Sequence, residues 1–421
     1  MISRIKNSPF AVNSIILFSG SMAGSILNYV FHLVVGRMVG VETYGEIESL
    51  ISLITIISIP AAALTMVATK YSAGSRAEND KKSSHELMAY LNKKVFIYGF
   101  PILILASAAI PFIKKFLNIS ENLPLILIWL IMFLTLLGAV NGGILAGWQK
   151  FKSVSWMGIL GALVKLIAVI IFLKAGFALS GAIGGFTLGV LASYIASIFA
   201  LKFIRREKNI SSYKPIDFRS LKRYVLPALL GNLAINILGN VDMVLAKHNL
   251  DAISAGQYGA LTIVSKIIFF ATGVIATVLF SMSAENSHQK SNSLSILKNA
   301  AGLMFLVSFG AMVVYFVFPE LVLSLLFGSK YSSVAPYLGF FAIIVTLFSF
   351  VNLFLQYLLS IHKTRIAYWL LAISILEIGL VMFLGKSISG IISIVAAVQI
   401  LAILASLTFL FYGNEREKLI S

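Results

Sequence analysis

Ionisable side chains lie inside three long apolar stretches of the sequence. Lys165 and Lys266 each interrupt a run of aliphatic and aromatic residues, and Glu377 interrupts a third. A charge at membrane depth is costly, so such residues usually face a partner or a water-filled cavity and serve a function. Lysine ammonium groups suit phosphate-like anions, and a buried carboxylate suits a coupling cation. Lys165 and Glu377 can form an ion pair or be solvated separately by one cavity, and the sequence leaves both readings open.

Polar side chains also follow one face of the first apolar segment. These residues are Ser14, Ser21, Ser25, Asn28 and His32. Their spacing keeps them on one side of a helix. Ser and Asn can join packed helices by hydrogen bonds, but so long a polar face in a membrane helix favours a wet cavity.

The seventh apolar segment carries a second polar face. Asn232, Asn236 and Asn240 recur every four residues, and Asp242 lies near the same end of the segment. Shorter polar arcs occur in the eighth and second segments. Their members are Thr262, Lys266, Gly273 and Thr277 in the eighth segment and Glu48, Ser52 and Thr55 in the second. We therefore expect the first, second, seventh and eighth segments to line a central cavity.

The composition shows which elements must position these side chains. Of 421 residues, 59% are hydrophobic and 12% are charged, whereas soluble domains carry about 25% charged residues. A soluble enzyme, a nucleic-acid-binding protein and a disordered scaffold are therefore excluded. The absence of Cys excludes disulfides and thiolate metal sites. No hydrolase or metalloprotease motif occurs, so we expect neither an enzyme nor a cofactor.

The apolar runs predict about twelve transmembrane helices, because each run far exceeds the ~10 residues of a membrane barrel strand. The predicted spans are 11–35, 44–69, 95–113, 123–147, 154–173, 179–201, 224–246, 258–283, 299–318, 335–361, 367–385 and 389–412. With the N-terminus inside, most of the 33 Lys and Arg residues fall on the inner side. The positive-inside rule then predicts cytoplasmic termini and a multi-pass protein of the cell inner (plasma) membrane.

A weak internal repeat divides the chain into two halves. Tyr44-Gly45 recurs as Tyr258-Gly259, and Lys150, Lys152 and Trp156 recur as Lys363, Arg365 and Trp369 at nearly the same offset. Six spans in each half give both halves the same orientation, which is a parallel repeat. We predict an N-terminal six-helix lobe at 1–212 and a C-terminal six-helix lobe at 213–421 around a central cavity.

A motif after the first span resembles a known transporter family. Residues 36–45 read GRMVGVETYG, with Arg37 at the end of the first helix, and the second half offers Asp242, then GQYG at 256–259 and Lys266. This pattern is similar to the polysaccharide (oligosaccharide) flippase family. Its superfamily also contains multidrug and toxin extruders and the lipid II flippases.

The resemblance implies two six-helix lobes and alternating access to the cavity. It further implies that an undecaprenyl-diphosphate-linked glycan is flipped from the inner to the outer leaflet for cell-surface polysaccharide export. The other expected partners are membrane lipids and a polysaccharide polymerase machinery. No nucleic-acid partner is expected. The candidate substrate-binding residues are Lys266, Arg37, Lys165, Asn28, Ser25, Asn236, Asn240 and Thr262. The candidate ion-coupling residues are Asp242, Glu377 and Glu48.

Two other functions remain open from the sequence. The main alternative is a cation-coupled multidrug extruder of the same superfamily, in which Asp242 or Glu377 would bind the ion. A non-transporting assembly partner of a cell-envelope polymerase is the third, and the polar helix faces disfavour it.

Overall fold

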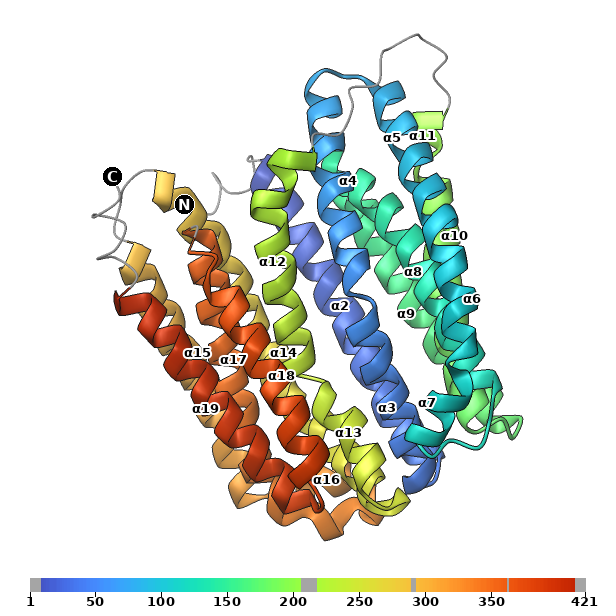
Figure 1. The fold of residues 1–421 in the computed structure, drawn as a ribbon, viewed down its shortest axis with the longest axis vertical. Coiled ribbons are helices and arrows are strands. Elements are labelled where there is room, and N and C mark those ends of the chain that lie inside the picture. Colours follow the sequence, from blue (N-terminus) through green and yellow to red (C-terminus); the bar gives the residue numbers. More distant parts are fainter. Residues whose placement is uncertain (1–8, 206–217, 289–292, 362, 413–421) are drawn as a thin grey trace. The chain divides into compact units, whose positions relative to one another are not determined.

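The computed structural model describes residues 9–205, 218–288, 293–361 and 363–412. Within these ranges the regular elements are helices, without a strand (Figure 1). Eleven helical segments of this part are long and apolar enough to cross a membrane. Helix α2 (Pro9–Met38), at the first predicted span, is not one of the eleven. The predicted all-α, multi-pass membrane architecture is confirmed.

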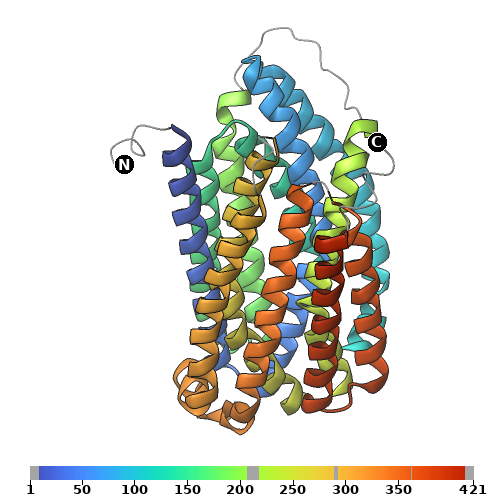
Figure 2. The ribbon, with the colours of Figure 1, turned by 90° about the vertical axis from the view of Figure 1, so that its left-hand side faces the viewer.

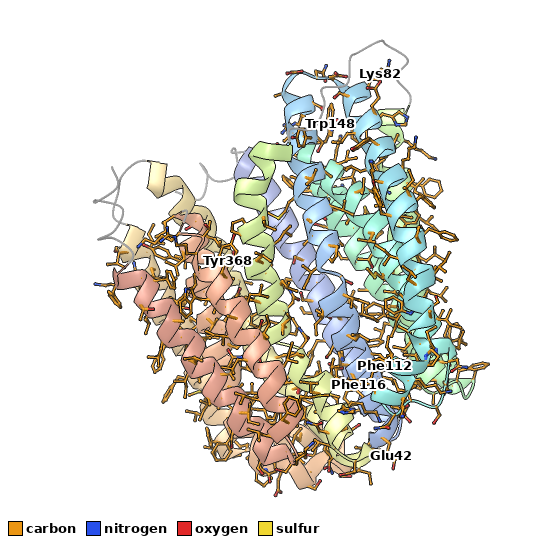
Figure 3. All side chains as sticks on the ribbon, in the orientation of Figure 1. Glu42, Lys82, Phe112, Phe116, Trp148 and Tyr368 are labelled. Carbon is orange, nitrogen blue, oxygen red and sulfur yellow. The ribbon has the colours of Figure 1, made fainter. Side chains whose placement is uncertain are left out.

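Contacts divide the chain into two compact units, which are described separately. Unit 1 comprises Met1–Val39 and Ile57–Lys222. Besides α2, it contains the following helices: α4 (Ile59–Ala77), α5 (Lys81–Lys94), the π-helix η1 (Val95–Gly99), α6 (Phe100–Ala108), α7 (Ile110–Phe116), α8 (Leu123–Gly147), α9 (Phe151–Lys174), α10 (Leu179–Ala200) and α11 (Lys202–Arg205). Its core gathers Ala68 of α4, Leu91 of α5, Ile144 of α8 and Met157 of α9. Lys82 and Trp148 lie near one end of this unit, and Phe112 and Phe116 lie toward the other (Figure 3).

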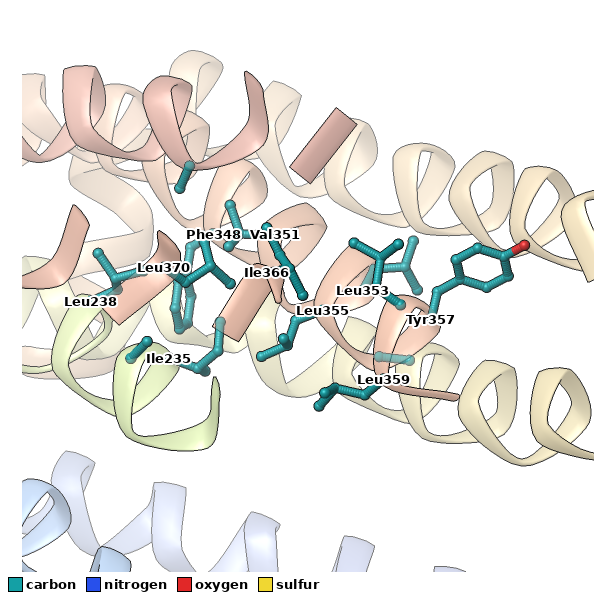
Figure 4. Close-up of a cluster of buried hydrophobic side chains, with 14 of the residues drawn as sticks. Ile235, Leu238, Phe348, Val351, Leu353, Leu355, Tyr357, Leu359, Ile366 and Leu370 are labelled. Carbon is teal, nitrogen blue, oxygen red and sulfur yellow. The ribbon is translucent and has the colours of Figure 1, made fainter. Parts of the chain in front are cut away.

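Unit 2 comprises Gly40–Ile56 and Arg223–Ser421. Its helices are α3 (Val41–Ile57), α12 (Phe218–Leu238), α13 (Val241–Asn249), α14 (Ala252–His288), α15 (Ser293–Val317), α16 (Pro319–Phe327), the 3-10 helix η2 (Ser329–Tyr337), α17 (Leu338–Ser360), α18 (Ile366–Leu384) and α19 (Ile388–Tyr412). Helices α15, α17 and α19 run alongside one another (Figures 1 and 2). The core of this unit joins Leu238 of α12, Phe348 and Val351 of α17, and Leu370 of α18 (Figure 4).

Several predicted spans consist of more than one helix. The second span, predicted at 44–69, consists of α3 and α4, and Pro60 stands in the first turn of α4, where its missing N–H is tolerated. The seventh span breaks at Gly239-Asn240, between α12 and α13. Asp251 follows this span and accepts a hydrogen bond from the Ser254 N–H at 3.0 Å. Hydrogen bonds from Ser254 lower the pKa of the exposed Asp251 carboxyl, because they favour its charged form.

Helix α3 comes from the N-terminal half of the chain but packs in unit 2. A Cβ on Gly256 would lie 1.9 Å from the Val41 carbonyl oxygen, so the backbones of α3 and α14 touch at this glycine. Tyr44 is fully buried, and its ring centroid lies 5.3 Å from that of Phe327. The motif at 36–45 therefore contains the point at which the chain passes from unit 1 to unit 2.

Candidate substrate and cation sites

Three asparagines recur every four residues where α12 leads into α13: Asn232 and Asn236 lie on α12, and Asn240 directly precedes α13. Asn232, Asn236 and Asn240 are half-buried. Each amide nitrogen donates to the carbonyl four residues earlier, at 2.8, 2.8 and 2.9 Å respectively. Each amide thus uses one N–H in a hydrogen bond to the backbone, and its oxygen points away from that carbonyl.

Lys266 of α14 completes this row. Its Nζ donates to Asn240 Oδ1 at 3.1 Å, and its side chain is half-buried. Asn240 carries a neutral amide, so this bond holds the ammonium group in place without cancelling its charge. The structure thus brings together Lys266, Asn240 and Asn236, three of the predicted substrate residues. We call Asn232, Asn236, Asn240 and Lys266 the asparagine row.

Thr262 of the eighth predicted span does not present its polar group in this way. Thr262 is buried, and its hydroxyl donates to the Tyr258 carbonyl of its own helix at 2.9 Å. The side chain of Thr277 lies outside the described residues, as does that of Ser14 in the first span.

Unit 1 contains a similar lysine–amide pair. Lys165 of α9 is buried, its Nζ donates to Asn28 Oδ1 of α2, and the Asn28 amide nitrogen donates to the Gly24 carbonyl at 2.9 Å. The ammonium nitrogen also lies 4.3 Å from the ring centroid of Phe31 and 4.7 Å from that of Phe186. Aromatic faces attract a cation, so the pocket suits a charged lysine.

The remaining candidates of unit 1 are also on α2. Ser25 is exposed on α2, and Arg37 is exposed at the end of the same helix. The Lys165–Glu377 ion pair stays a prediction, because Lys165 belongs to unit 1 and Glu377 to unit 2.

Two buried carboxyl groups form the candidate cation site in unit 2. Asp242 of α13 accepts a hydrogen bond from the Tyr258 hydroxyl at 2.7 Å on Oδ2, and its Oδ1 has no hydrogen-bond partner among the described residues. Glu377 of α18 is fully buried, and both of its carboxyl oxygens likewise find no partner in the described part of the chain. Asp242 and Glu377 come from α13 and α18, two helices that pack against each other. Buried acceptors of this kind require a proton or a bound cation.

Other polar groups of unit 2 surround α13. The sequence did not single out Gln399 of α19, which is fully buried and donates to the Leu238 carbonyl at 3.3 Å, where α12 ends. Its amide oxygen has no hydrogen-bond partner among the described residues. A polar residue in the twelfth predicted span was the available signal. Glu48 is also buried, and a Cβ on Gly259 would lie 3.3 Å from its Cβ.

The sequence likewise missed an ion pair between α3 and α13. Lys247 Nζ lies 3.7 Å from Glu46 Oε1, and the Lys247 side chain is only 3% exposed. The seventh span was predicted to end at residue 246, but α13 extends to Asn249 and buries Lys247. The signal missed was the continuation of the seventh span beyond residue 246.

Comparison with known proteins identifies the family. The family model described as "Polysaccharide biosynthesis protein" matches residues 10–287, which is more than half of the chain. The chain belongs to the polysaccharide biosynthesis protein family. This membership confirms the resemblance drawn from the motif at 36–45. No curated protein matches the chain.

Solved structures show the fold of this family member. An inward-facing multidrug resistance MATE transporter of the MOP superfamily superposes with a TM-score of 0.75 at 15% identity, covering 96% of this chain and 97% of that one. An outward-facing MATE transporter of that superfamily gives 0.66 at 16% identity, covering 96% of each chain. The lipid II flippase MurJ in an inward closed conformation gives 0.71 at 13% identity, covering 94% and 87%. The predicted two-lobe transporter fold is confirmed.

Proposed function

We propose that this protein flips an undecaprenyl-diphosphate-linked oligosaccharide from the inner to the outer leaflet by alternating access, for cell-surface polysaccharide export. The observation that carries the proposal is the asparagine row. A diphosphate needs cationic donors, which Lys266 supplies, and a glycan needs amide groups, which the asparagines supply. Family membership favours this cargo over a drug.

The pair of Lys165 and Asn28 extends the proposal to unit 1. We assign Lys165, Asn28, Ser25 and Arg37 to the same cargo, with the lobes at 1–212 and 213–421 moving against each other. A dianionic head group that crosses outward under an inside-negative potential of ~100 mV gains about 4.6 kcal/mol, at ~2.3 kcal/mol per charge. The membrane potential can therefore drive the export step.

Asp242 and Glu377 are proposed to bind a coupling cation, with Glu48 as a further candidate. Two buried carboxyl groups with unbonded oxygens are stabilised when a cation or a proton enters. The ion would then bias one conformation over the other, which is how a binding event can drive a transport cycle.

The protein is placed by this proposal in the cell inner (plasma) membrane, with both termini cytoplasmic. Its proposed partners are the lipid-linked glycan, membrane lipids and a polysaccharide polymerase machinery that uses the flipped product.

The test is reconstitution of the purified protein into liposomes. We expect it to move a labelled polyprenyl-diphosphate glycan between leaflets and not to export a cationic dye. Liposomes with the Lys266→Glu variant provide the matched control, because this change reverses the charge proposed to bind diphosphate. Dye efflux without glycolipid movement would contradict the proposal.

That opposite outcome would support the alternative, a cation-coupled multidrug extruder. The observation that favours the alternative is the buried pair of Asp242 and Glu377, because buried acids suit an ion-coupled exporter of cations. The single lysine and the amides of the asparagine row disfavour it, since a cationic drug would be repelled by Lys266 and would leave polar amides unpaired.

A further inference from the structure

The asparagine row offers two kinds of chemistry at separate positions. Lys266 and Asn240 stand at one end, and Asn236 and Asn232 follow toward the other end of the described row. The first pair carries a positive charge, and the second pair is neutral. A ligand that fills the whole row therefore needs an anionic part followed by a polar, uncharged part.

The hydrogen bonds along α12 fix the direction of the amides. If either amide were turned over, its oxygen would face the oxygen of the Ala228 or Asn232 carbonyl instead of donating an N–H to it. The oxygens of Asn232 and Asn236 are thus held as acceptors, and each amide keeps one further N–H. A hydroxyl group both donates and accepts one hydrogen bond, so it can satisfy both atoms of such an amide.

The spacing of the amides suits a sugar. Residues four apart on one helix face are separated by about 6 Å along the axis, at 1.5 Å per residue. This is comparable to the span of one sugar ring with its hydroxyl groups. An apolar or aromatic ligand would leave these half-buried amides unpaired, which is costly and gives discrimination against it.

We propose that Asn232 and Asn236 recognise the sugar next to the diphosphate, while Lys266 recognises the diphosphate itself. This inference rests on the proposed function and deepens it. It assigns selectivity for a hydroxylated glycan to two amides and leaves affinity for the anionic group to the lysine. Glycan recognition and diphosphate recognition are then separable by substitution.

The experiment measures equilibrium binding of two synthetic probes to the purified, full-length protein in detergent. One probe is farnesyl diphosphate, and the other is farnesyl diphosphate that carries one N-acetylglucosamine. We expect the unaltered protein to bind the sugar-bearing probe about tenfold more tightly, because about 1 kcal/mol per hydrogen bond from one or two bonds gives a difference of this order.

The variants separate the two roles. Asn236→Leu should abolish the tenfold preference and leave the affinity for farnesyl diphosphate unchanged, which also shows that the variant is folded. Lys266→Ala should weaken binding of both probes by a similar factor and leave their ratio unchanged.

A further arm needs no substitution. The per-O-acetylated sugar probe lacks hydroxyl donors, and we expect it to bind the unaltered protein no more tightly than farnesyl diphosphate does. Equal binding of all three probes, or an Asn236→Leu variant that keeps the sugar preference, would overturn the inference and leave the proposed function standing. Failure of farnesyl diphosphate and its glycoside to bind would overturn both.

Discussion

Individual residues hold charge at membrane depth in two different ways. Lys266 is held by a neutral amide, so its charge stays available to a ligand. Asp242 and Glu377, by contrast, are buried, and Asp242 Oδ1 and both Glu377 oxygens have no hydrogen-bond partner within the described residues. The first arrangement suits an anionic cargo, and the second suits an ion that enters and leaves.

Substitution of Lys266 tests the first arrangement. Lys266→Arg should retain transport, because charge and donors remain. Lys266→Ala should lower the rate of transport at least about tenfold, which corresponds to about 1.4 kcal/mol. Lys266→Glu should abolish transport. Glycolipid flipping is measured at matched membrane abundance. Lys298→Glu, at an exposed position of α15, is the control and should transport normally. Normal flipping by an abundant Lys266→Glu protein would refute the diphosphate role.

Substitution of Glu377 tests the second arrangement. Glu377→Gln keeps the shape and removes the buried charge, so it should remove the dependence of transport on Na⁺ or pH. It should also raise the thermal unfolding midpoint in low-sodium buffer at neutral pH, because a buried glutamine is neutral without taking up a proton or a cation. Glu320→Gln, at an exposed position of α16, should change neither property. A Glu377→Gln protein with unaltered ion dependence would exclude Glu377 from coupling.

At the scale of elements, helix α3 has an unusual position in the fold. Its sequence neighbours on both sides belong to unit 1, yet Tyr44, Gly45 and Glu46 all pack in unit 2. The close approach at Gly256 requires the absence of a side chain. The family motif therefore has a structural role in seating α3 on α14.

A pair of glycine substitutions on α14 measures this packing. Gly256→Ala should destabilise the protein by about 1–3 kcal/mol, because its Cβ would force the backbones of two helices apart. Gly273→Ala is the control on the same helix, where a Cβ meets nothing within 4 Å, and it should change stability little. Thermal unfolding in detergent checks both, and equal midpoints would contradict the tight packing.

At the scale of the whole molecule, the chain builds two compact units and enters unit 2 twice. The lysine–amide pair occurs once in each unit, through Lys165 and Asn28 in unit 1 and Lys266 and Asn240 in unit 2. The lysines come from spans that are not equivalent in the repeat, the fifth and the eighth. The two pairs therefore do not arise from the repeat, although in each of them an asparagine amide oxygen holds a lysine ammonium group.

The natural absence of Cys allows the orientation to be tested directly. Lys152 and Lys174 stand near opposite ends of α9, whose 24 residues extend about 36 Å, enough to span the hydrocarbon core. In intact cells, a membrane-impermeant thiol reagent should label Lys174→Cys at once. It should label Lys152→Cys only after the membrane is opened. The reverse pattern would invert the predicted topology.

The sequence by itself determined the membrane class, most of the spans and the family. Apolar runs such as 123–147 coincide with their helices because, in hydrocarbon, a backbone must satisfy its own hydrogen bonds, so length and composition suffice. Lys266 and Glu377 could also be found from the sequence, because a charged side chain inside an apolar span is costly and rare.

Only the tertiary structure decided which side chains meet. Thr262 lies on the same helical face as Lys266 in the sequence pattern, but its hydroxyl donates to the Tyr258 carbonyl of its own helix. Gln399 donates to the Leu238 carbonyl, which is the end of α12 at the break before α13. Glu46 pairs with Lys247 because α3 packs in unit 2. Helical periodicity fixes the direction of a side chain around one helix, whereas partners from distant segments depend on how the helices pack.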